Sequence, residues 1–139
     1  MTALPTAAPS AAPDTRAQPM MTVLRFVLLA EALAGLVLAI FLSLLAGNVD
    51  VDTETSLRFA AGGAFLFAIF AAVASRGVRR RRGWAWTLSA ILQVLLAVGT
   101  GLAIFVATWH PAYLAGFGLA AVVMVVLSAS SVRRALGQE

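Results

Sequence analysis

The chain has 139 residues, of which 61% are hydrophobic and 12% are charged, and its formal net charge is +4. A soluble domain is about 45–50% apolar and about 25% charged, so this chain has too little polar surface to coat a water-soluble globule. It has no cysteine and one histidine, which excludes disulfides, thiolate metal sites and a multi-histidine site within one chain. It contains no P-loop, GxSxG or HExxH motif, and we expect no enzymatic activity, cofactor or metal.

The N-terminal segment 1–19, MTALPTAAPSAAPDTRAQP, holds four of the five prolines and has no periodic apolar face. This composition is typical of a disordered tail, which we place in the cytoplasm. Met20 and Met21 stand directly before the first apolar run, so Met1, Met20 and Met21 are all candidate translation starts. That run is longer than the apolar region of a secretory signal peptide, which has about 7–15 residues.

Four apolar segments then reach the length that crosses a bilayer core, about 20 residues at about 1.5 Å per residue. We predict helices at 23–46, 57–75, 84–108 and 111–131, within a membrane domain at 20–134 that a short cytoplasmic tail at 135–139 follows. Asp52 or Thr53 is expected to cap the second helix, and Pro111 suits the first turn of the fourth. The predicted fold is all-α, an up-down antiparallel bundle of four transmembrane helices.

Arginine supplies all ten basic residues, and nine of them fall on one side of this predicted topology. Positively charged loops are retained in the cytoplasm, so both termini are predicted to be cytoplasmic in a multi-pass protein of the cell inner (cytoplasmic) membrane. We interpret the cluster between the second and third helices as a topology signal that contacts anionic lipid headgroups, not nucleic acid. It consists of Arg76, Arg79, Arg80, Arg81 and Arg82.

Aromatic residues mark both expected membrane interfaces, two on the cytoplasmic side and two on the outer side. They are Trp84, Trp86, Trp109 and Tyr113. The outer side also carries Asp50, Asp52, Glu54 and His110. Such a group could hold a hard or borderline cation, but its spacing matches no calcium loop, and we favour an acidic cap over the second helix.

A single acid, Glu31, interrupts the first apolar segment in the stretch LLAEALAG. An acid centred in a membrane costs about 2.5–3.5 kcal/mol on insertion scales, so we expect a neutral carboxyl with a polar partner. Gln93 lies at a similar depth in the third segment, which runs in the same direction, and we predict a Glu31–Gln93 hydrogen bond. The pair is interpreted as a structural contact between helices or, alternatively, as a proton or ligand site.

Small residues recur every four positions in all four segments, which lets helices approach closely in a membrane. The predicted stripes are Glu31, Gly35, Ala39, Ser43 and Gly47; Ala60, Ala64, Ala68 and Ala72; Ser89, Gln93, Ala97 and Gly101; and Ala112, Gly116 and Ala120. They predict a compact bundle in which the helices touch one another.

The stretch LLAEALAG resembles the first helix of small multidrug resistance transporters, four-helix proteins whose acid in that helix exchanges protons for cationic drugs. The resemblance implies that Glu31 is a proton carrier. It is confined to this stretch, and both the arginine-rich loop and the missing AYxxW-type segment depart from that family.

Across nearly the whole membrane region, the stretches LLAEALAGLVLA, RGWAWTLSAILQVLL and SSVRRAL look like an uncharacterised group of small four-helix integral membrane proteins of high-GC Gram-positive bacteria. That resemblance implies a topology and no activity. We therefore expect a non-enzymatic membrane component, either a homo-oligomer or an accessory to a membrane protein partner. The alternative is a small proton-coupled transporter with Glu31 as its carrier carboxylate.

Overall fold

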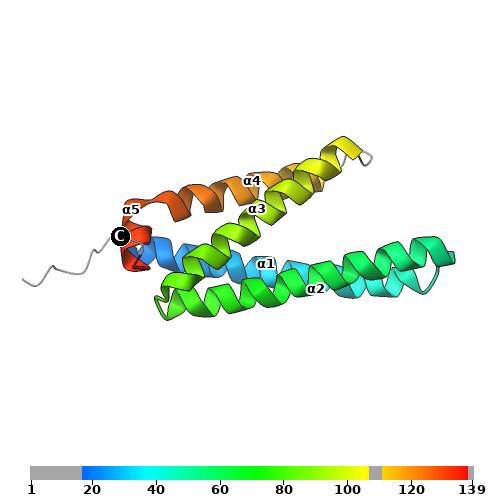
Figure 1. Ribbon diagram of the computed structural model, residues 1–139, viewed down its shortest axis with the longest axis horizontal. Helices are drawn as coiled ribbons and strands as arrows, with labels where there is room; N and C mark the ends of the chain where they lie inside the picture. Colours follow the sequence, from blue (N-terminus) through cyan, green and yellow to red (C-terminus); the bar gives the residue numbers. More distant parts are fainter. Residues whose placement is uncertain (1–16, 107–110, 138–139) are drawn as a thin grey trace, which may run out of the picture.

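The computed structural model describes residues 17–106 and 111–137, which form five helices joined by short turns (Figure 1). They are α1 (Ala17–Ala46), α2 (Val51–Arg79), α3 (Gly83–Val106), α4 (Pro111–Ser128) and α5 (Ser130–Ala135). The protein is all-α, as predicted. Helices α1, α2 and α3 are long and apolar enough to cross a membrane, whereas α4 is apolar but shorter.

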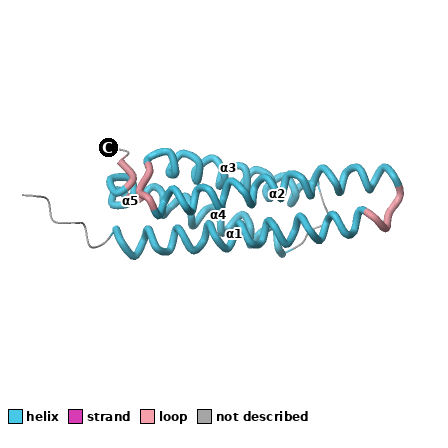
Figure 2. The backbone as a smooth tube through the Cα atoms, turned by 90° about the horizontal axis from the view of Figure 1, so that it is seen from below, coloured by secondary structure: helices cyan, strands magenta, loops and turns pink. Residues whose placement is uncertain are grey.

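The four long helices form two antiparallel pairs, α1–α2 and α3–α4. The pairs meet at the end where α5 and the turn at 80–82 lie, which we call the joined end, and they separate toward the other, divergent end (Figure 1). Seen at right angles, all four helices run close to one direction (Figure 2). The contacts between the two pairs are therefore concentrated at the joined end.

Each pair is held by small residues. A Cβ placed on Gly35 would lie 3.1 Å from the carbonyl oxygen of Ala64 and 3.2 Å from the Cβ of Ala68, so α1 and α2 are in close contact there. In the second pair, a Cβ on Gly116 would lie 2.8 Å from Cγ2 of Thr100. Close approach at small residues is how helices pack where lipid removes the hydrophobic drive between them.

The predicted stripe on α2 is wrong in part, because Ala60 and Ala72 are exposed. The buried face of α2 instead passes through Ala61, Ala68, Ala71 and Ala74. A strict four-residue repeat drifts around a helix of about 3.6 residues per turn, so it leaves the buried face within a few turns.

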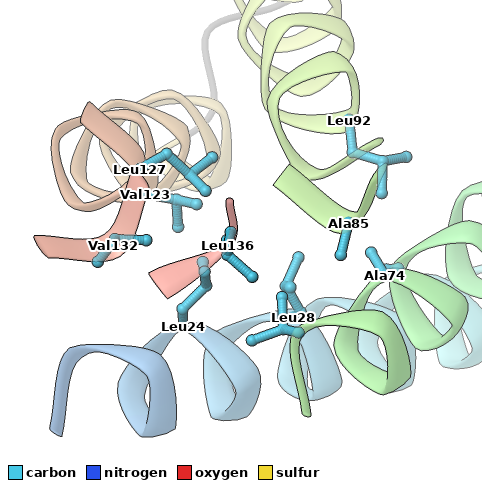
Figure 3. Close-up of a cluster of buried hydrophobic side chains, with 11 residues drawn as sticks. Leu24, Leu28, Ala74, Ala85, Leu92, Val123, Leu127, Val132 and Leu136 are labelled. Atoms are coloured by element: carbon cyan, nitrogen blue, oxygen red, sulfur yellow. The ribbon is translucent and has the colours of Figure 1, made fainter. Parts of the chain in front are cut away.

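The apolar core fills the joined end, where side chains from all five helices converge (Figure 3). It is built from Leu24, Leu28, Ala71, Ala74, Val78, Ala85, Leu92, Val123, Leu127, Val132 and Leu136. Two of these residues lie beyond the predicted end of the fourth helix at 131, and the second of them belongs to the predicted tail at 135–139. Val132 is 0% exposed and Leu136 is 1% exposed.

Helix α4 ends at Ser128 rather than at 131, because Ala129 adopts an extended conformation (φ −62°, ψ 129°) and the chain turns back into α5. The break removes the helical donor that the carbonyl of Leu127 would otherwise have. The indole Nε1–H of Trp86 donates to that carbonyl oxygen instead, at 2.9 Å. Trp86 thus helps to hold the position at which α4 stops.

Several predicted boundaries need correction. Helix α1 begins at Ala17, so residues 17–19 are helical rather than part of a disordered tail, and Pro19 lies in the first turn, where a helix tolerates proline. The rest of that tail, 1–16, lies outside the described residues. Helix α2 begins at Val51, six positions before the predicted start at 57, and the residue that caps it is Asp50 rather than Asp52 or Thr53.

Candidate functional site

The predicted hydrogen bond between Glu31 and Gln93 is present between α1 and α3, midway along α1. The Gln93 amide Nε2 donates to both carboxyl oxygens of Glu31, at 3.0 Å to Oε1 and 2.9 Å to Oε2. Glu31 is 5% exposed and Gln93 is 0% exposed, so the pair is sealed from its surroundings. It is a direct polar link between the two helix pairs.

Two more polar atoms in this region are buried and have no hydrogen-bond partner within the described part of the chain. They are Oε1 of Gln93 and Oγ of Ser89, which lies one turn before Gln93 on α3. Buried polar atoms are usually paired, so an unpaired oxygen and an unpaired hydroxyl give this cluster unused capacity for hydrogen bonding. Ser89 belongs to the same predicted stripe as Gln93, but the four-residue spacing alone does not assign a hydrogen-bonding role to its hydroxyl.

The amide of Gln93 can serve either charge state of Glu31. Its NH₂ group donates to an ionised carboxylate, as in the geometry above. Rotated by 180° about its last bond, the amide would offer Oε1 as the acceptor for a protonated carboxyl. The cluster can therefore keep Glu31 hydrogen-bonded whether the carboxyl carries a proton or not.

The arginine cluster that was predicted between the second and third helices does not lie wholly in a loop. Arg76 and Arg79 belong to the last turn of α2, and the connection to α3 consists of residues 80–82. Arg81 has φ +50°, its N–H donates to the carbonyl of Val78, and the N–H of Arg82 donates to the carbonyl of Gly77. These two bonds define a Schellman motif, in which a left-handed residue ends the helix.

Three of the four aromatic residues predicted at the interfaces are described. The half-exposed Trp84 packs beside Gly77, whose missing side chain makes room for it, because a Cβ there would lie 2.7 Å from Cη2 of Trp84. Trp86 is half-buried and bonded to α4, so it joins helices and is not only an interface marker. Tyr113 is also half-buried, and Trp109 lies outside the described residues.

The acidic group at the divergent end caps α2. Asp50 accepts from the N–H of Thr53 at 3.3 Å and from its hydroxyl at 3.1 Å, and these two bonds hold the pKa of Asp50 below its usual value. Glu54 pairs with Arg58 one turn further along α2. Within 17–106 and 111–137, no group of three or more His, Cys, Asp and Glu side chains could hold a metal ion, and His110 lies outside that range.

Comparison with protein-family models, with curated proteins and with solved structures finds no match to this chain. The fold and the site geometry described above are therefore the basis for the functional proposals that follow.

Proposed function

We propose that this protein is a non-enzymatic, multi-pass membrane component that associates with other transmembrane helices through the divergent halves of its helix pairs. The observation that carries the proposal is a set of helix glycines whose open side faces no close neighbour in the described part of the chain. Apart from the backbone of its own helix turn, a Cβ built on any of them would find no atom of the described residues within 4 Å: Gly62, Gly63, Gly99, Gly101 and Gly118.

These glycines differ from those that act within the chain. Gly35 and Gly116 sit in tight helix contacts, which explains why a residue without a side chain stands there. A glycine in a helix interior costs about 1 kcal/mol relative to alanine, and membrane helix interfaces are enriched in glycine because it lets backbones approach. The unpartnered glycines therefore favour a further helix, in a second copy or in an accessory partner, that approaches α2, α3 and α4.

The extent of uncovered surface supports the same proposal. Only 28%, 22% and 17% of the most apolar windows of α1, α2 and α3 are buried within the chain. The Glu31–Gln93 bond links the two pairs at the middle of α1, and the pairs separate toward the divergent end. In this proposal the polar cluster stabilises the packing of the two pairs, and the divergent halves bind other transmembrane helices.

The test is energy transfer between labelled copies of the full chain in lipid bilayers at decreasing protein-to-lipid ratio. We expect the parent to associate, and the Gly99→Leu/Gly101→Leu variant to lose at least about tenfold in affinity, which is about 1.4 kcal/mol. The control is Val23→Leu/Ala30→Leu, which adds bulk at two exposed positions of α1 away from these glycines and should change little. The proposal is contradicted if the parent stays monomeric and also forms no glycine-dependent cross-link to another membrane protein. It is equally contradicted if the glycine variant associates as strongly as the parent.

We also propose that α4 spans the membrane with the other three helices, and that both termini face the cytoplasm of the cell inner membrane. Arginines from α1, α2 and α5 support this orientation, because they gather at the joined end: Arg25, Arg76, Arg79, Arg133 and Arg134. Since the chain has no cysteine, single substitutions such as Ser131→Cys and Thr53→Cys can be labelled from one side of sealed vesicles. Opposite accessibility of the two thiols supports the topology, and equal accessibility overturns it.

A second candidate is a small proton-coupled transporter in which Glu31 is the carrier carboxylate. It is favoured by the unpaired Oε1 of Gln93 and Oγ of Ser89, which leave the buried cluster able to accept a proton or a ligand. Labelling of Glu31 by a hydrophobic carbodiimide across pH separates the two functions. Labelling that titrates near neutral pH and is blocked by cationic compounds supports transport. Labelling that appears only in Gln93→Leu supports a structural role for the Glu31–Gln93 hydrogen bond.

A further inference from the structure

We propose that Arg25, Arg76 and Arg79 form a binding site for the phosphate headgroup of an anionic phospholipid at the joined end of the α1–α2 pair. These side chains line a cavity of about 400 Å³, together with Leu29, Ala72 and Ser75. Arg25 comes from α1, and Arg76 and Arg79 come from α2, so the site exists only when the two helices are packed side by side. This site is separate from the glycine surfaces on which the proposed function rests.

The three guanidinium groups have no acidic partner in the described parts of the chain. Glu54 pairs instead with Arg58, near the other end of α2. Apart from the buried Glu31, the described acids are Asp50, Asp52 and Glu54, which all lie at the opposite end of α2. A neighbouring cavity of about 260 Å³ shares Arg25 and Arg79 and adds Arg81 to its lining. No described acid lies near this concentration of positive charge, which leaves it available to an anionic group.

Arginine is the side chain best suited to a phosphate group. Its planar guanidinium presents paired N–H donors that match two phosphate oxygens, and it stays charged at every physiological pH. Arg76 and Arg79 are exposed and Arg25 is half-exposed, so the three can reach a group at the edge of the membrane. Ser75, which is 2% exposed, donates from its hydroxyl to the backbone carbonyl of Arg25 at 3.5 Å and links the two helices beneath the cavity.

The apolar part of the lining indicates a lipid rather than free phosphate. Leu29 follows Arg25 by four residues on α1, and Ala72 precedes Arg76 by four residues on α2. Because the two helices are antiparallel, both apolar residues lie one turn deeper than the arginine on the same helix. Leu29 is 40% exposed and Ala72 is exposed, so an apolar surface continues from the charged end toward the middle of the helices, as an acyl chain requires.

The experiment counts phosphatidylglycerol bound to the full chain in phosphatidylcholine nanodiscs, by native mass spectrometry after release from the disc. We expect one tightly held phosphatidylglycerol on the parent. The variant Arg25→Gln/Arg76→Gln/Arg79→Gln should lose at least about tenfold in affinity, because it removes the charged donors to the phosphate group. The matched control, Arg80→Gln/Arg82→Gln/Arg133→Gln, removes the same charge from positions that do not line the cavity. It should bind phosphatidylglycerol like the parent.

Two outcomes overturn the proposal. Equal loss in the control and the test variant would mean that only the overall charge attracts the lipid. Displacement of phosphatidylglycerol by millimolar inorganic phosphate would mean that the site recognises the phosphate alone. Two further variants separate loss of binding from misfolding. Arg76→Gln changes one exposed position, and replacement of all three arginines by lysine keeps the charge and should retain part of the binding.

Discussion

The indole N–H of Trp86 donates to the carbonyl oxygen of Leu127, and this bond fastens the start of α3 to the end of α4. It satisfies a carbonyl that the break at Ala129 leaves without its helical donor. The same break sends the chain back across the joined end, where Val132 and Leu136 complete the core. One side chain on α3 thereby stabilises the position of α5, which lies more than 40 residues further along the chain.

Replacement of Trp86 by phenylalanine should destabilise the fold by about 1–3 kcal/mol, because it leaves the Leu127 carbonyl without its donor. Unfolding of the protein in mixed detergent with increasing dodecyl sulfate measures the loss. Hydrogen exchange at the amides of Val132 and Leu136 should accelerate together with it, since α5 depends on that turn. The control is Trp84→Phe, at a half-exposed ring that makes no such bond to α4, and an equal loss there would contradict the assignment.

Replacement of Gln93 by leucine should destabilise the protein by about 1–3 kcal/mol, because Glu31 then keeps a buried carboxyl without its donor. Removing both partners in Glu31→Leu/Gln93→Leu should recover much of that loss, since neither polar group is left unpaired. The same unfolding measurement on the two single variants and the double variant gives the coupling free energy. Strictly additive losses would show that the hydrogen bond between the two side chains contributes nothing.

Replacement of Gly77 by alanine should destabilise the joined end by about 1–3 kcal/mol, the usual cost of overpacking. The new Cβ would lie 2.8 Å from the Cβ of Ala85 and 2.7 Å from the ring of Trp84. Gly63→Ala is the matched control, because its Cβ would meet nothing and alanine is the better helix former by about 1 kcal/mol. Measured in detergent as monomers, the two variants should move the unfolding midpoint in opposite directions.

Replacement of Arg81 by glycine should stabilise the protein by up to about 1 kcal/mol. Arg81 adopts the left-handed conformation with φ +50°, which costs free energy for any residue that carries a Cβ and none for glycine. Arg80→Gly, at a neighbouring position with φ −89°, removes the same charge without that relief. The difference in unfolding midpoint between the two variants is the measurement, and a midpoint for Arg81→Gly at or below that for Arg80→Gly would contradict the conformational argument.

The cap on α2 should stabilise the helix at neutral pH and fail in acid. Because hydrogen bonds from Thr53 lower the pKa of Asp50 in the folded state, its stabilising contribution is complete above the unfolded pKa of about 3.9 and is lost as pH falls through the folded value. Asp50→Ala should therefore be less stable than the parent at pH 7, and the two should converge as the pH approaches 2. A gap that stays constant down to that pH would show that the charge on Asp50 is not involved.

The fold class and the central polar contact could be predicted because both depend on simple properties of the sequence. Apolar segments longer than a membrane core predict helices without reference to any partner. Glu31 and Gln93 could be paired because two isolated polar residues in hydrocarbon need a partner at equal depth. Their bond is present in the structure, while its role remains a proposal.

The remaining features depend on tertiary contacts that no local pattern encodes. The segment SSVRRAL spans the predicted end of the fourth helix and the start of the predicted tail, and the burial of Val132 and Leu136 becomes apparent only when the core at the joined end is assembled. The arginine cavity combines Arg25 with Arg76 and Arg79, which lie about 50 residues apart in the sequence. The start of α2 at Val51 could not be predicted from hydropathy, because its first turn is polar and hydropathy identifies only the apolar part of a helix.

The arrangement of the two helix pairs also has a mechanical consequence. The core at the joined end and the Glu31–Gln93 bond, which lies at the middle of α1, connect the two pairs, and beyond that bond the pairs separate. From Glu31 to its end at Ala46, α1 is about 22 Å long, at about 1.5 Å per residue. A rotation of only about 10° at the bond would move that end by about 4 Å, close to the width of a side chain. A small change in the angle between the two pairs is thus amplified, by leverage alone, into a displacement of about one side chain at the divergent end.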